Sequence, residues 1–118
     1  MKSVVTQIGE MALQFEEDHV IVFFGPKAPN ELRDISLIHE PTKGVFDGSL
    51  LLPNHQLVLG EQVYDITRVG SEAANNFEEL GHISVYFTEP PSEILPGAVY
   101  VKPHQWPDVQ MGMTIEFR

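Results

Sequence analysis

The sequence predicts a mainly β fold, a small barrel- or sandwich-like single domain with one or two short helices outside the sheet. Two observations carry this prediction. The chain consists of many short apolar or alternating runs, and glycines and prolines separate these runs. Its length of 118 residues is that of one domain, so we expect residues 1–118 to fold as a single unit.

The first 44 residues predict three strands and one helical turn. Residues 4–8 and 35–39 have the composition of strands. The apolar run from His19 to Phe24 ends at Gly25-Pro26 and indicates a buried strand. Residues 29–34 favour a helical turn with Asn30 as its N-cap, and residues 41–44 favour a turn.

The rest of the chain predicts a hairpin, a helix and three further strands. Residues 57–59 and 63–69 flank Gly60-Glu61-Gln62, which is the pattern of a hairpin. Residues 72–80 favour a short helix, with Ser71 as N-cap and Gly81 just beyond the last turn. The strands are expected at residues 83–87, 98–101 and 111–117, the last with clear alternation.

The central apolar positions of the clearest strands predict the core. We expect it to contain Val20, Val22, Ile66, Val85, Ile115 and Phe117.

Composition and charge exclude several classes of protein. The formal charge of −10 disfavours binding to nucleic acid or anionic lipid, and it would either attract a basic protein partner or only keep the protein soluble. The absence of cysteine excludes disulfides, thiolate zinc sites and cysteine nucleophiles. The N-terminus lacks the apolar core of a signal peptide, and no stretch is long and apolar enough to span a bilayer. We therefore expect a cytoplasmic protein.

Histidines are the only obvious reactive groups: His19, His39, His55, His82 and His104. No two stand at His-x-His or His-x3-His spacing, so we expect no metal site, although distant histidines could still converge on one. There is no Walker-type phosphate loop and no Gly-x-Ser-x-Gly elbow. We expect no cofactor.

Two of these histidines stand at places where a site could form. In an extended segment Ile35, Leu37 and His39 share one face, and Pro41 then turns the chain. This pattern alone favours a hydrogen-bonded structural histidine at position 39. His82 follows Gly81 at a helix end, where it could cap terminal carbonyls or serve as a second active-site imidazole; the pattern alone favours the cap.

Three blocks of sequence resemble the glucitol/sorbitol-type IIA component of the bacterial phosphoenolpyruvate-dependent sugar phosphotransferase system (PTS). They cover nearly the whole chain, and the block that ends at His82 is the most specific. The blocks are Ala28-Pro29-x2-Leu32 followed by Ile38-His39; Leu59-Gly60-x3-Tyr64-x-Ile66-Thr67-x-Val69-Gly70-Ser71-x-Ala73-x2-Asn76-x2-Glu79-Leu80-Gly81-His82; and Leu95-Pro96-Gly97-x-Val99-x-Val101.

The resemblance implies a phosphotransferase component. Such a protein accepts a phosphoryl group from phospho-HPr on a histidine and passes it to the IIB component of a IIB/IIC sugar permease. By position the phosphohistidine falls on His39, and we expect phosphate on its Nε2. His82 is a possible assistant, and the backbone N–H groups at Gly70 and Ser71 are a possible phosphate cradle if they fold nearby.

Two alternatives remain open from the sequence. One is a non-catalytic regulatory or ligand-binding β domain of the same fold. The other is a metal-dependent enzyme on a small barrel, which requires two or three histidines to converge.

Overall fold

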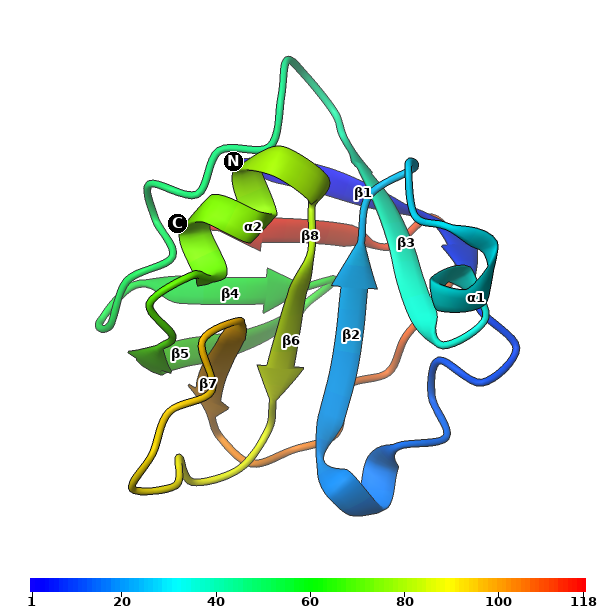
Figure 1. The fold of residues 1–118 in the computed structure, drawn as a ribbon. Coiled ribbons are helices and arrows are strands. Elements are labelled where there is room, and N and C mark those ends of the chain that lie inside the picture. Colours follow the sequence, from blue (N-terminus) through cyan, green and yellow to red (C-terminus); the bar gives the residue numbers. More distant parts are fainter.

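Eight strands close into one barrel in a computed structural model that describes all residues from 1 to 118 (Figure 1). Two short α-helices and one 3-10 turn lie outside the sheet, as the sequence predicts for a small barrel. The strands are β1 (Lys2–Ile8), β2 (Val20–Phe24), β3 (Ser36–Pro41), β4 (Gln56–Leu59), β5 (Gln62–Val69), β6 (Ile83–Tyr86), β7 (Ala98–Lys102) and β8 (Thr114–Phe117). The helices are α1 (Asn30–Arg33) and α2 (Ala73–Leu80), and the 3-10 turn is Glu16–Asp18.

The strands follow one another around the barrel in the order β1-β3-β2-β6-β7-β5-β4-β8, and β8 pairs with β1 to close it. All pairs are antiparallel except β2 with β3 and β6 with β7. Parallel neighbours require a connection that returns to the starting end of the sheet. The segment containing α1 makes this return between β2 and β3, and residues 87–97 make it between β6 and β7.

The predicted hairpin is confirmed. Val58 pairs with Val63 and Leu59 with Gln62, so Gly60 and Glu61 form a two-residue loop. Gly60 has a φ of 62°, a backbone conformation that residues with a side chain rarely adopt. The predicted helix after Gly70 is also present, and it ends as expected at Gly81 in the left-handed conformation with φ 66°.

Helix α2 packs its apolar side into the barrel. Ala73 and Phe77 are fully buried in the main core, and the Phe77 ring lies 5.3 Å from the ring of Phe117. Figure 1 shows α2 against the barrel beside the start of β6. Neither α-helix has the length and apolar character needed to cross a membrane.

Four of the six predicted core residues are buried, namely Ile66, Val85, Ile115 and Phe117. Val20 and Val22 are only half-buried and face outward, whereas Ile21 and Phe23 of the same strand are fully buried. The prediction for these two valines was wrong because β2 is apolar on both faces. Its outward Phe24 is buried with Ala28 and Ile38 in a small separate cluster.

The ends of several elements differ from the predictions. Strand β8 begins at Thr114 and not at residue 111, β1 begins already at Lys2, and β6 ends at Tyr86. Pro29, not Asn30, is the N-cap of α1, and Asn30 is the first helical residue. Glu72, not Ser71, is the N-cap of α2, and it makes no side-chain cap bond. Strand β3 extends through Pro41, which pairs with Ser3 of β1, so the turn begins one residue later. Pairing with a neighbouring strand outweighs the local preference of proline for a turn at this point.

The fold predicts which substitutions in β8 are costly. Ile115 is fully buried between β1 and β4, while its neighbour Thr114 is exposed. We expect Ile115→Ala to lower the free energy of unfolding by about 2–5 kcal/mol and Thr114→Ala to change it by about 0.5 kcal/mol or less. Urea denaturation measures both. Equal effects would contradict the assignment of Ile115 to the core.

Candidate functional site

His39 lies on the inner face of β3 and has no exposed surface. Strand alternation places it there, because Leu37 and His39 point into the barrel while Ile38 packs outward with Phe24 and Ala28. Burying an imidazole is unfavourable unless its nitrogens find hydrogen-bond partners. The surroundings of His39 supply a partner for each.

Both ring nitrogens of His39 are hydrogen-bonded to protein atoms. Nδ1 lies 2.7 Å from the Oγ of Ser3, and Nε2 lies 2.8 Å from the carbonyl oxygen of Gly81. Ser3 reaches the ring from β1, where Val5 is the residue directly opposite His39 and Ser3 is its inward diagonal neighbour. Gly81 reaches it from the end of α2. The ring therefore joins β1, β3 and α2.

The chemistry of these partners fixes the tautomer of His39. A carbonyl oxygen only accepts hydrogen bonds, so Nε2 carries the proton and donates it to Gly81. In the neutral ring Nδ1 is then the acceptor, and the Ser3 hydroxyl donates to it. A serine hydroxyl can also accept, so Ser3 could serve the opposite tautomer as well.

Burial keeps His39 uncharged. Loss of solvent lowers the pKa of His39 from 6.5 to about 4, and the hydrogen bond to Gly81 offsets part of this effect. The ring is therefore neutral at pH 7. A neutral imidazole has a nucleophilic nitrogen lone pair, whereas the imidazolium has none.

Three phenylalanines surround the His39 ring. The ring centroids of Phe46, Phe23 and Phe77 lie 4.8, 5.7 and 5.8 Å from that of His39. Phe23 and Phe77 are fully buried in the main core. Phe46 belongs to the loop of residues 42–55 between β3 and β4 and is only partly buried.

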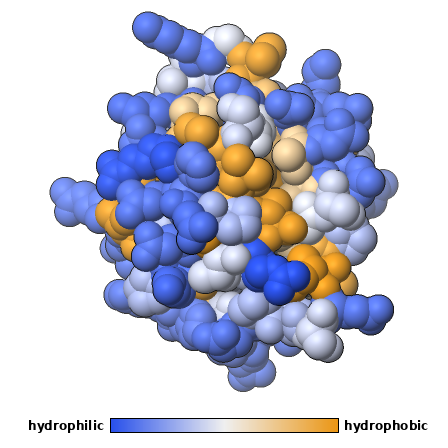
Figure 2. Space-filling model, turned by 90° about the vertical axis from the view of Figure 1, so that its left-hand side faces the viewer, coloured by the Kyte–Doolittle hydropathy of each residue, from blue (hydrophilic) through white to orange (hydrophobic).

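A surface cavity of about 230 Å³ lies on the other side of Phe46. Its lining includes Pro26, Lys27, Val45, Phe46, Glu79 and Leu80. Figure 2 shows a broken band of hydrophobic side chains on the face that carries α2 and the loop of residues 42–55. Val45 contributes strongly to the apolar surface here because 77% of it is exposed. Phe46 is the lining residue that also contacts His39.

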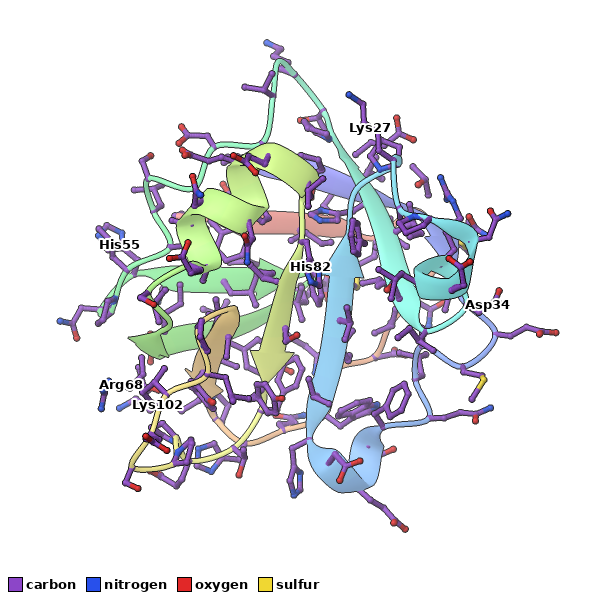
Figure 3. The ribbon with its side chains drawn as sticks, in the orientation of Figure 1. Lys27, Asp34, His55, Arg68, His82 and Lys102 are labelled. Carbon is purple, nitrogen blue, oxygen red and sulfur yellow. The ribbon has the colours of Figure 1, made fainter.

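His82 directly follows Gly81, whose carbonyl accepts from His39, but its own ring points the other way. Along β6 the inward residues are Ile83 and Val85, so His82 falls on the outer face. There its ring stacks on Phe24 with centroids 4.4 Å apart, and Nδ1 lies 3.2 Å from the carbonyl oxygen of Phe23. Figure 3 shows His82 between β2 and β6. The two imidazoles thus occupy opposite faces of the sheet.

Gly70 and Ser71 lie at the opposite end of α2 from Gly81. A helix of eight residues is about 12 Å long, so this end is well separated from the carbonyl that binds His39. The N–H of Gly70 donates to the carbonyl of Ala98. The structure therefore does not bring the expected phosphate cradle to His39.

Ser3 and Phe46 were not predicted from the sequence. A signal for Ser3 existed, because it alternates with Val5 on β1 and so falls on the inner face. Phe46 lies in a loop without periodicity, and nothing in its local sequence indicates what it covers. The histidines do not converge, and no group of three or more metal-ligating side chains is present.

Comparison with known proteins identifies the family. The protein-family model for the PTS system glucitol/sorbitol-specific IIA component matches residues 1–116. The chain belongs to this family. It is 32% identical over 116 residues to the glucitol/sorbitol-specific EIIA component of Escherichia coli (strain K12), with 98% of this chain and 92% of the relative covered. The component from Shigella flexneri gives the same identity and coverage.

A solved structure supports the same assignment. The crystal structure of a PTS system IIA component from Enterococcus faecalis V583 matches with a TM-score of 0.90 at 30% identity, covering 99% of this chain and 98% of that one. This chain is therefore a phosphocarrier IIA component of a phosphotransferase system, built on the same barrel.

The buried ring of this IIA component should make stability depend on pH. Because the pKa of His39 is about 4 in the folded state and 6.5 when unfolded, the unfolded state binds more protons between these values. Stability should therefore rise with pH across this window and fall by about 3 kcal/mol on acidification through it. Urea denaturation at several pH values measures this change.

Two matched variants isolate the contribution of His39. His39→Gln should flatten this part of the profile, while His19→Gln, at an exposed position, should leave it unchanged. A profile for His39→Gln parallel to that of the wild type would show that other groups cause the slope.

Proposed function

We propose that this protein accepts a phosphoryl group from phospho-HPr on Nε2 of His39 and passes it to the IIB component of a glucitol/sorbitol-type permease. The observation that supports this most is the state of the His39 ring. It is neutral, each nitrogen is oriented by a protein atom, and Phe46, which contacts the ring, also lines a surface cavity. Family membership supplies the reaction class.

The transfer requires a lone pair on Nε2. In this structure Nε2 carries a proton, so this proton must leave and Nδ1 must gain one, and the carbonyl of Gly81 must move aside to make room for the phosphorus atom. Ser3 can accommodate the change, because its hydroxyl oxygen can accept the new Nδ1–H after donating to Nδ1 before. The Nε2 lone pair then forms the N–P bond. The N–P bond of the donor's phosphohistidine breaks, and its electron pair returns to the donor ring.

After transfer the ring carries the phosphoryl group on Nε2 and a proton on Nδ1. Ser3 would hold that proton and stabilise the positive charge on the ring. Passage to IIB reverses the step, with the phosphoryl group leaving to the acceptor and the electron pair returning to Nε2. Lys27 is the one cation that lines the surface cavity, beside Glu78 and Glu79, and would offer its charge to the incoming phosphoryl oxygens. No cofactor is needed for these steps.

One observation favours a second function. A histidine that is fully buried, with both nitrogens hydrogen-bonded, also fits a purely structural role. In that case the protein would be a regulatory or ligand-binding β domain that has kept the fold. Phosphoryl uptake distinguishes the two functions directly.

The first test is phosphoryl uptake. The protein is mixed with phosphoenolpyruvate, enzyme I and HPr, and intact-mass analysis shows whether it gains one phosphoryl group. We expect labelling of the wild type and of His82→Gln, and none of His39→Gln. The two substitutions make the same chemical change on opposite faces of the sheet, so they form a matched pair.

Each outcome of this test has a clear meaning. An unlabelled wild type would favour the regulatory domain. Full labelling of His39→Gln would move the site elsewhere. If His82→Gln transfers about 10²-fold more slowly than the wild type, the assisting role that the sequence suggested for His82 is supported, and it requires His82 to turn inward.

The second test concerns Ser3. Removing its hydroxyl leaves Nδ1 of His39 without a partner, so Ser3→Ala should slow single-turnover phosphorylation by about 10²-fold. Ser3→Thr keeps the hydroxyl and should restore most of the rate. A purely structural hydroxyl would lower the melting temperature of Ser3→Ala and leave its transfer rate within a few-fold of wild type.

A further inference from the structure

His39 has no exposed surface, yet the proposed reaction brings a phosphoryl group to its ring. A surface cavity lies beside Lys27 and Leu80. Phe46 lines this cavity and also contacts the His39 ring. A group that enters from the cavity therefore meets Phe46 before it meets His39.

The Phe46 ring occupies a seat made by two glycines. A Cβ placed on Gly81 would lie 2.5 Å from Cζ of Phe46, and one placed on Gly25 would lie 3.0 Å from its Cε2. The N–H of Gly25 also donates to the carbonyl of Leu80, which fixes the two glycines side by side. The absence of side chains at Gly25 and Gly81 thus leaves space for the phenyl ring next to Gly81, whose carbonyl accepts the hydrogen bond from His39.

The segment that carries Phe46 is weakly held by its backbone. Residues 43–46 make no main-chain hydrogen bond. On either side the chain is anchored, because the N–H of Thr42 donates to the carbonyl of Lys2 and the N–H of Gly48 donates to Glu78. Movement of these four residues therefore breaks no main-chain hydrogen bond and costs mainly the contacts of the Phe46 ring.

We propose that Phe46 controls access to His39, leaving its glycine seat to admit the phosphoryl donor and returning to cover the ring. This inference rests on the proposed function of His39 and adds how that site opens. When Phe46 is out, the hydrogen bond between Nε2 and Gly81 faces the cavity, and a donor that displaces the carbonyl of Gly81 can reach the nitrogen. When it returns, it excludes water from the site and so protects a phosphohistidine from hydrolysis.

Chemical modification of the resting protein tests this access without any phosphoryl transfer. Diethyl pyrocarbonate acylates a nitrogen lone pair of accessible neutral histidines. His39 is neutral at pH 7, so positive charge does not protect it from the reagent. Trypsin releases residues 34–43, a peptide with His39 as its only histidine, and residues 3–27, whose only histidine is the exposed His19. His19 is the internal reference.

Phe46→Leu and Phe46→Ala are compared with Phe77→Leu. Phe77 also contacts the His39 ring but lies wholly inside the core. We expect both Phe46 variants to raise the acylation rate of His39 relative to His19 by about tenfold or more, because they enlarge the open population. Phe77→Leu should leave this ratio within a few-fold of wild type, and melting temperatures are measured for every variant.

The outcomes separate this inference from the function on which it rests. An unchanged ratio in the Phe46 variants overturns it, and so does an equal rise in Phe77→Leu, which would indicate general loosening. Phosphorylated Phe46→Leu should also lose its phosphate faster than the wild type, and an equal lifetime counts against protection by Phe46. If no variant is phosphorylated but the acylation ratio rises as expected, Phe46 controls access and the carrier role of His39 fails.

Discussion

The two hydrogen bonds of the His39 ring are the constraint on which the site depends. They connect β1 through Ser3, β3 through His39 itself and the end of α2 through Gly81. A buried imidazole without both partners would cost more than the packing around it returns. The inward position of Ser3 and the left-handed turn at Gly81, which ends α2, bring these two partners to one ring.

The burial of the His39 ring has two opposite consequences for phosphoryl transfer. It keeps the imidazole neutral and therefore nucleophilic, and it would shield an N–P bond from water. It also closes the ring to any protein that must reach it. A carrier of phosphoryl groups needs both properties in turn, since the group must stay on the protein between partners and leave quickly when a partner arrives. A small moving segment beside a rigid barrel meets both needs at little cost in stability.

The parts of the fold that could be predicted are those where local pattern and tertiary structure agree. The hairpin around Gly60, the end of α2 at Gly81 and the alternation of β8 are of this kind. Val20 and Val22 were misplaced because β2 is apolar on both faces, so its periodicity carries no direction. His39 was predicted as the site residue through family resemblance. The alternation of Ser3 with Val5 indicates an inward position, but its place beside His39 depends on strand register, and the place of Phe46 depends on how its loop folds.

The order of strands around the barrel has a consequence for biosynthesis. Strand β8 is synthesised after the other seven strands, yet it is the strand that lies between β1 and β4. Until it is made, both of these strands keep an open edge with unpaired main-chain groups, which can recruit strands from other chains. A nascent chain that stalls before Thr114 would therefore expose two unpaired strand edges and tend to aggregate. Pairing of β8 with β1 and with β4 removes both open edges at once.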